Sequence, residues 1–342
     1  MGTKEPTGMD NKSSMMLRKM PLLAALLIAV VSEIQAQPTK NLQAVDVFDL
    51  EFASNPEISP AGDKILYVRN FKDIMSDQNL SNIWIVDWDG TNNLPITTGN
   101  QRDRSPSWSP DGTRMVYLSN KDGTTQIYMK WLESGHETKL TNLYEPPKNL
   151  SWSPNGQWIC FNMLVETPRD TQVKLKGKPK GAEWNEPARY IDDMSYRSDG
   201  TRGFTKSGYD QLFVISVDGG TPRQVTYASN HIGKADWSKD LKAVYFHANL
   251  HKDADYQPRN SEIYRLSLDE NKITALTDRF GPDTNPKVSP DGRHLAFTGY
   301  DDQFLGYQIN KLYLMDLEDQ SIETLIPEFD RSVGNIRWSQ DG

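Results

Sequence analysis

The sequence lacks the motifs that identify several common classes of enzyme. It contains no Gly-x-Ser-x-Gly, the pattern that carries the nucleophile of an α/β-hydrolase. It also contains no glycine-rich phosphate loop, no paired-cysteine zinc spacing and no strand followed by a capped helix for a dinucleotide. We therefore expect no catalytic residue, no cofactor and no metal within these 342 residues.

Cysteine and positive charge are also scarce. The single cysteine, Cys160, lies in an apolar stretch, so no disulfide can form within the chain and we expect a buried, unreactive thiol. The chain has 38 Lys and Arg residues against 46 Asp and Glu residues, a net charge of −8. An acidic protein without a basic stripe is a poor nucleic-acid binder, which excludes that partner.

No apolar run reaches the length of a membrane-spanning helix. The longest, residues 20–31, has 12 residues against the roughly 20 that a span requires. It follows Arg18 and Lys19 and precedes Ala36, a small residue suited to cleavage before Gln37. Residues 1–36 are predicted to be a signal peptide, with an uncleaved anchor as the alternative, and the mature protein is expected to be exported, periplasmic or secreted, without membrane attachment.

One short pattern returns six times along the chain. An apolar residue or Trp is followed by Ser, then by Pro or another residue, and in most copies by Asp, Asn or Ala and Gly; the serines are Ser59, Ser109, Ser153, Ser238, Ser289 and Ser339. Their spacings are 50, 44, 85, 51 and 50 residues, which suits a four-stranded propeller blade in every interval but the long one. Pro, Asp and Gly in this order favour a tight turn, so these serines are turn residues rather than nucleophiles.

Strand-like runs rich in β-branched and aromatic residues follow each complete copy. A second such run comes ten to twenty residues later, and an outer strand is expected to end in Leu-Thr or Val-Thr, as at 140–141, 225–226 and 276–277. The predicted fold is an all-β propeller of four-stranded antiparallel blades over residues 55–342. Five blades, at about 55–98, 105–141, 149–226, 234–277 and 285–326, precede the start of a sixth at Asn335, so we expect an incomplete propeller.

Two segments stand outside this pattern. Residues 37–54 are predicted to be a lead-in to the first blade, and residues 164–208 an insertion in the third. Long loops in compact domains are usually functional or disordered. His247 and His251 have metal-ligand spacing only on a helix, and here they lie at a strand end and in a loop, so a metal site is not expected there.

Two stretches resemble a known family. The first reads VDVFDL at 45–50 and NPEISPAGDKILYV at 55–68; the second reads RYI at 189–191, YRSDG at 196–200, GYDQLFV at 208–214 and DGGTPRQVT at 218–226. They resemble the propeller entry and the extended third blade of the prolyl oligopeptidase family, especially its secreted acylaminoacyl-peptidase and dipeptidyl-peptidase-like members.

The resemblance implies the amino-terminal, substrate-selecting propeller of an exported serine peptidase that acts on short peptides. In the family a carboxy-terminal α/β-hydrolase domain supplies the Ser, Asp and His; this sequence does not contain it, so we expect the chain to be inactive alone and to meet its peptide substrate through that missing domain. In exopeptidase members acidic propeller residues hold the substrate amine, and Glu183 and Glu186 are the candidates here, against the alternative that both are surface glutamates.

A second hypothesis remains open. A stand-alone propeller of the TolB type, acting as a periplasmic binding or scaffold module, uses the same Ser-Pro-Asp-Gly turns. The turn motif does not separate the two hypotheses, whereas the lead-in and the third-blade insertion favour the peptidase. The oligomeric state is not readable from the sequence.

Overall fold

The computed structural model describes residues 1–2, 41–167, 177–185, 191, 194–199 and 203–342. The chain divides into two compact units, residues 1–47 and 48–342. Within the described ranges one short 3-10 helix occurs, η1 (Ala44–Asp49), and no helix there is long and apolar enough to cross a membrane. The predicted signal peptide lies almost entirely outside the described residues, so the structure does not bear on it.

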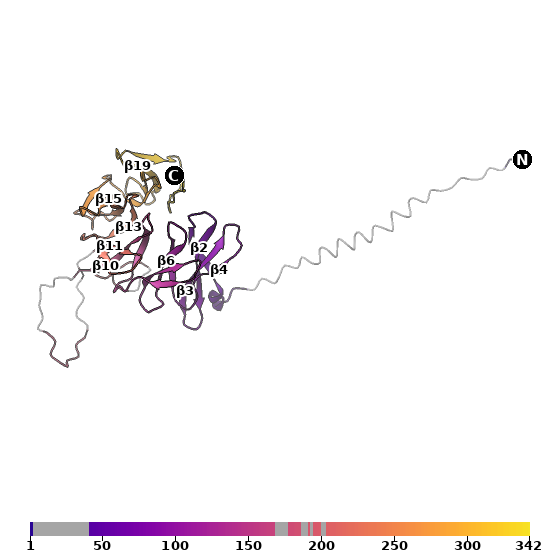
Figure 1. Cartoon of the computed structure of the whole chain (residues 1–342), viewed down its shortest axis with the longest axis horizontal. Helices are drawn as coiled ribbons and strands as arrows, with labels where there is room; N and C mark the ends of the chain where they lie inside the picture. The colour runs from indigo at the N-terminus through magenta and orange to yellow at the C-terminus, as the bar shows by residue number, and fades with distance from the viewer. Residues whose placement is uncertain (3–40, 168–176, 186–190, 192–193, 200–202) are drawn as a thin grey trace. The chain divides into compact units, whose positions relative to one another are not determined.

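Residues 52–325 form five four-stranded antiparallel sheets, each a meander of consecutive strands. Figure 1 shows them following one another from indigo to yellow. The strands are β1 (Phe52–Ile58), β2 (Lys64–Asp73), β3 (Gln78–Asp87) and β4 (Leu94–Pro95); β5 (Asp103–Trp108), β6 (Arg114–Ser119), β7 (Gln126–Trp131) and β8 (Glu137–Lys139); β9 (Lys148–Trp152), β10 (Trp158–Glu166), β11 (Gly208–Ser216) and β12 (Arg223–Gln224); β13 (Ile232–Trp237), β14 (Ala243–Ala248), β15 (Glu262–Ser267) and β16 (Lys272–Ala275); and β17 (Asp283–Val288), β18 (His294–Gly299), β19 (Lys311–Asp316) and β20 (Ile322–Leu325). The predicted fold class is confirmed.

The repeated turn joins the first and second strands of a sheet. In the second sheet, the Oγ of Ser109 accepts a hydrogen bond from the backbone N–H of Arg114 at 2.9 Å and donates one to Asp111 at 2.5 Å. Gly112 has φ of 70°, a left-handed conformation that a side chain would strain. The motif therefore reverses the chain because the serine hydroxyl accepts a backbone N–H of the turn and the glycine adopts the left-handed conformation that the turn requires.

The tryptophans of the motif join neighbouring sheets. The indole N–H of Trp108 donates to the carbonyl of Glu57 at 2.9 Å, and the indoles of Trp152 and Trp237 donate to Ser107 and Ser151 at 3.1 and 3.2 Å. Each acceptor lies in the first strand of the preceding sheet. Each Trp therefore buries apolar area and satisfies its N–H at the same time.

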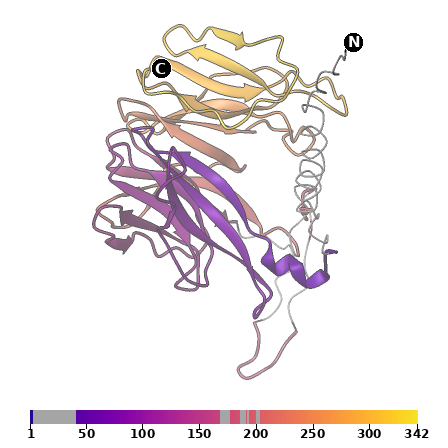
Figure 2. The same cartoon turned by 90° about the vertical axis from the view of Figure 1, so that its right-hand side faces the viewer.

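Apolar side chains fill the space between successive sheets. Val116, Phe161 and Ile159 belong to one buried cluster of the second and third sheets. Cys160 lies in the next cluster with Phe246, and only 1% of its surface is exposed, which confirms the expected buried thiol. Burial raises the pKa of this thiol to about 12, so it is inert. Side chains of the fourth and fifth sheets form a further buried cluster, and Figure 2 shows these two sheets next to each other in orange and yellow.

The structure corrects the predicted ends of the outer strands. Three of them, β8, β12 and β16, end one residue before the Leu-Thr or Val-Thr pair. The threonine instead turns its hydroxyl onto the third strand: Oγ1 of Thr141 accepts from the N–H of Ile127 at 3.0 Å, and Thr226 and Thr277 repeat this bond. The pair thus ends the outer strand because its hydroxyl takes a ladder hydrogen bond.

The other predicted boundaries fall near observed ones. The first sheet begins at Phe52, inside the segment expected to be a lead-in. The third-sheet insertion lies between Glu166, where β10 ends, and Gly208, where β11 begins. Residues 335–342, expected to start a sixth blade, contain no strand, although the indole of Trp338 donates to the carbonyl of Lys287 at 3.0 Å, as the other motif tryptophans donate to the preceding sheet.

Candidate functional site

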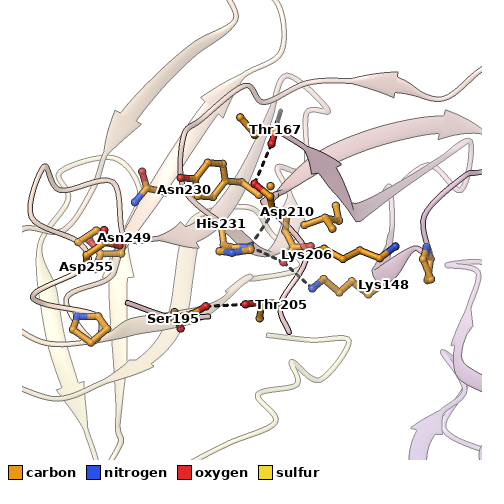
Figure 3. A pocket seen from close by; sticks show the side chains of 17 residues that line it. Lys148, Thr167, Ser195, Thr205, Lys206, Asp210, Asn230, His231, Asn249 and Asp255 are labelled. Carbon is orange, nitrogen blue, oxygen red and sulfur yellow. Dashed lines mark hydrogen bonds and ion pairs between the residues drawn. The ribbon is translucent and has the colours of Figure 1, made fainter. Parts of the chain in front are cut away.

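A groove of about 800 Å³ lies at the strand ends opposite the repeated Ser turns. Its walls come from the start of β9, the start of β11, the segment before β13, the loop after β14 and the two ends of the third-sheet insertion. Figure 3 shows its central side chains. The labelled lining residues are Lys148, Thr167, Ser195, Thr205, Lys206, Asp210, Asn230, His231, Asn249 and Asp255.

Asp210 lies at the centre of the groove between two partners. Its Oδ2 is 2.7 Å from Nζ of Lys148 and 2.9 Å from Nδ1 of His231. The side chain of Asp210 is 13% exposed, whereas that of Lys148 is half exposed and that of His231 is mostly exposed. Burial opposes ionisation of Asp210, but the hydrogen bonds from His231 and Lys148 outweigh it and lower the pKa of the carboxyl group.

The fold brings these three residues together from separate parts of the chain. Lys148 begins β9 and Asp210 is the third residue of β11 in the same sheet, while His231 directly precedes β13 of the next sheet. The imidazole of His231 also lies edge-on to the ring of Tyr209, with 5.5 Å between ring centroids. The cluster therefore joins the third and fourth sheets at their groove ends.

The ends of the insertion form one wall of the groove. The hydroxyl of Ser207 donates to the carbonyl of Thr167 at 3.0 Å, and that of Thr205 donates to the carbonyl of Ser195 at 2.9 Å. Lys206 forms an ion pair with the largely buried Glu145, and this hydrogen bond raises the pKa of the lysine. These contacts hold the two ends of the insertion beside β9 and β11.

This arrangement suits binding better than proton transfer. A general base near neutral pH needs a pKa close to the working pH. Asp210 has a lowered pKa and already contacts two side chains, Lys148, which donates to it, and His231, whose Nδ1 also accepts from the backbone N–H of Asp210 at 3.1 Å, so it holds them in place rather than accepting a proton. The exposed faces of Lys148 and His231 remain for a polar ligand.

Only one of the two acidic residues predicted from sequence, Glu183, can be placed relative to this groove. Glu183 is exposed and is not among its lining residues, and Glu186 lies outside the described residues, so their role stays a prediction. His247 and His251 have different neighbours: Nδ1 of His247 accepts from the N–H of Asn285, and Nε2 of His251 is 3.6 Å from Glu262.

Sequence reasoning missed the Asp210 cluster. Lys148 and His231 are 62 and 21 residues from Asp210 in the sequence, and spacings of this length match no recognisable sequence motif. The available signal was indirect: Asp210 lies in the GYDQLFV segment that carries the family resemblance.

Two family models match the chain in sequence. The TolB beta propeller domain matches residues 31–176, and the dipeptidyl peptidase IV N-terminal region matches residues 182–307. The second match contains Asp210, His231 and most of the other groove residues.

Curated relatives include peptidases that are much longer than this chain. The uncharacterized peptidase YuxL of Bacillus subtilis is 28% identical over 66% of this chain and 34% of its own length. Dipeptidyl-peptidase 5 of Porphyromonas gingivalis is 22% identical over 85% of this chain and 44% of its own length. The chain thus spans less than half of the length of these relatives.

Solved structures share the fold. The acylaminoacyl peptidase of Pyrococcus horikoshii superposes with a TM-score of 0.61 at 15% identity, over 84% of this chain and 41% of its own. A putative TolB from Agrobacterium tumefaciens superposes with a TM-score of 0.53 at 20% identity, over 85% of this chain and 87% of its own. With the two family matches and the peptidase relatives, the five sheets identify the chain as a propeller like the amino-terminal propeller of the prolyl oligopeptidase family.

Proposed function

We propose that this propeller selects short peptides for an exported serine peptidase, whose hydrolase domain supplies the catalytic residues. The observation that carries the proposal is the position of the groove: most of its lining residues lie in the segment that matches the dipeptidyl peptidase IV N-terminal region. A groove of about 800 Å³ has the size of a site for a short peptide or a similar ligand. The wall built by the insertion then limits which peptides fit.

The coding sequence beyond the codon for Gly342 gives the first test. We expect it to encode an α/β-hydrolase domain with Gly-x-Ser-x-Gly and a later Asp and His. The protein of that complete reading frame should hydrolyse chromogenic dipeptide or blocked amino-acid substrates. A reading frame that ends without such a domain would contradict the proposal.

The groove itself is tested in the same protein by Asp210→Asn. The substitution removes the charge that holds Lys148 and His231, so we expect KM for a peptide substrate to rise about tenfold with kcat unchanged. Asp218→Asn is the matched control, because Asp218 is an exposed residue just beyond the other end of β11. A fall in kcat with an unchanged KM would place Asp210 in the chemistry instead.

The second candidate function is a stand-alone binding propeller. The TolB domain match and the superposition on a TolB-type structure over most of both chains favour it. It predicts a reading frame that completes the propeller and stops, and no peptidase activity in the resulting protein.

Export and amine binding belong to the same proposal. Cleavage of residues 1–36 should leave Gln37 as the first residue of the mature protein, which amino-terminal sequencing of the cell envelope or medium fraction checks. If Glu183 and Glu186 hold the substrate amine, Glu183→Gln and Glu186→Gln should each weaken the binding of peptides with a free amino terminus and leave the binding of amino-blocked peptides unchanged.

A further inference from the structure

A second hollow adjoins the groove and has the opposite charge balance to the chain. It measures about 700 Å³ and shares Lys148, Asp210 and His231 with the groove. Asp210 is the one carboxylate among its lining residues, and Lys148 already pairs with it. Two further cations, Lys234 and Arg259, line the hollow, so this basic pocket carries excess positive charge in a chain of net charge −8.

Lys234 breaks the repeat of the fold at this point. Each of the five first strands has a bulge three residues before the Trp position of the motif, and in four of them the bulge residue has a positive φ of 49–56°, whereas Lys234 of β13 does not. Asn favours this left-handed conformation. The residues at this position are Asn55, Ser105, Asn149 and Asn285 in the other four strands, and Asn335, with φ of 54°, in the sixth copy of the motif. A lysine at this position does not serve the turn geometry, so its side chain requires another explanation.

Lys234 has no ion-pair partner among the described residues, although acidic groups lie nearby. Burial, together with repulsion from Lys287 and Arg337, lowers its pKa to about 8 in spite of attraction from Glu57 and Asp236. Asp236 is itself occupied, because its carboxylate accepts from Nζ of Lys287 and from the N–H of Val288, both at 2.9 Å. Glu57 is likewise paired with Arg337. The ammonium group of Lys234 therefore makes no direct ion pair with a described residue, and an anion in the pocket would supply one.

The floor of the pocket offers an uncharged donor beside this lysine. A Cβ on Gly233 would lie 2.2 Å from Nε2 of His247, so the glycine leaves the space that the imidazole occupies. Burial lowers the pKa of His247 to about 4, which keeps the ring neutral. Because Nδ1 accepts from the N–H of Asn285, the proton is on Nε2, and His247 is a neutral donor.

We propose that the basic pocket binds a carboxylate of a short peptide, with Lys234 and Arg259 as its counter-charges and His247 as a neutral donor. Guanidinium and ammonium groups bind carboxylates through charge-assisted hydrogen bonds, and Arg adds the possibility of two parallel bonds. The carboxylate comes from the peptide carboxy terminus or from an Asp or Glu side chain. The inference rests on the proposed function, because it places the carboxylate of the peptide that the groove selects in this pocket.

Isothermal titration calorimetry of the full 342-residue chain tests the inference with three tetrapeptides. They are tetra-alanine with a free carboxy terminus, tetra-alanine amide, and the amide with Glu at the last position. We expect the free acid to bind about tenfold more tightly than tetra-alanine amide. Tight binding of the Glu-containing amide assigns the pocket to side-chain carboxylates, and its weak binding assigns the pocket to the carboxy terminus.

Two variants locate the effect. Lys234→Met and Arg259→Gln should each reduce the affinity for the free acid about tenfold and leave that for tetra-alanine amide unchanged. Lys242→Met is the matched control, because this exposed lysine lies in the turn between β13 and β14, at the other end of the strands. Arg259 is exposed, so its variant keeps the test valid if Lys234→Met does not fold.

Equal binding of free acid and amide, or no binding of any of the three, would overturn the inference. Equal affinities in both pocket variants and the control would overturn it as well. None of these results depends on a hydrolase domain, whereas the proposed function fails when the continued reading frame lacks one. The two failures are therefore distinguishable.

Discussion

The two ends of the strands differ in what they repeat. At the motif end, Ser109, Ser153 and Ser289 each accept from a backbone N–H five residues later at 2.9 Å and donate to the side chain two residues on at 2.5–2.7 Å. At the groove end, the third sheet has a long insertion and the fourth has Lys234 where other sheets have Asn or Ser. Repeated residues build the fold, and departures from the repeat gather where the hollows lie.

The largest expected effect breaks the motif end. Trp237→Ala removes a side chain that is 5% exposed, contacts the core of the third and fourth sheets, and donates to the carbonyl of Ser151. We expect the free energy of unfolding to fall by about 3–5 kcal/mol, measured by urea denaturation, because truncation leaves a cavity. Trp88→Ala is the control at an exposed site and should cost under about 1 kcal/mol. Equal losses in the two variants would contradict the assigned role of the motif tryptophans.

Much of this fold could be predicted because the information repeats. Six copies of one turn at blade spacing define the strands between them, and the register within each sheet follows from the turn. The predicted end of the outer strand at Leu140-Thr141 was wrong for a local reason. The hydroxyl of Thr141, rather than a backbone carbonyl, accepts from the N–H of Ile127, and the β-propensity of threonine does not reveal such a bond.

The groove could not be predicted in the same way. Asp210 meets Lys148 and His231 only because adjacent sheets pack side by side. The roles of Glu183 and Glu186 stay predictions, whereas Lys234, which lines the proposed basic pocket, stands out when the six motif copies are aligned, because the others have Asn or Ser at this position. A departure from a repeat therefore marks a residue that the repeated fold does not require.

The next effect sharpens the comparison at the groove end. Glu262 begins β15, and its side chain is 2% exposed. The corresponding residues are Gln126, which begins β7 in the second sheet, and Gln211 in β11 of the third sheet. In the second and fourth sheets the side-chain oxygen contacts the threonine that follows the outer strand: Oε1 of Gln126 accepts from the hydroxyl of Thr141, and Oε2 of Glu262 accepts from that of Thr277. Burial raises the pKa of Glu262 to about 7 in spite of the hydrogen bond from Thr277.

Glu262→Gln should therefore stabilise the protein in a pH-dependent way. Between the unfolded pKa near 4.5 and the folded value of about 7, the native state binds the proton more tightly, so the stability that protonated Glu262 contributes is lost as pH rises through this window. We expect a gain of about 1–3 kcal/mol at pH 8 and little change at pH 4. Urea denaturation at both values measures it, with the exposed Glu270→Gln as control. A gain of the same size at both pH values would show that ionisation is not its cause.

The smallest effect tests whether the copies of the turn are energetically equivalent. Ser153→Ala and Ser289→Ala each remove a buried hydroxyl that accepts one backbone N–H and donates to one side chain. Because the geometry is the same, we expect each to cost about 1 kcal/mol in urea denaturation, with the exposed Ser321→Ala near zero. Similar losses would mean that the motif contributes to each sheet independently of its neighbours, as expected of a repeat whose units contact only adjacent units. A much larger loss at Ser153 would instead show that the turn before the insertion also supports the groove end, and the separation between the two ends of the strands would no longer hold.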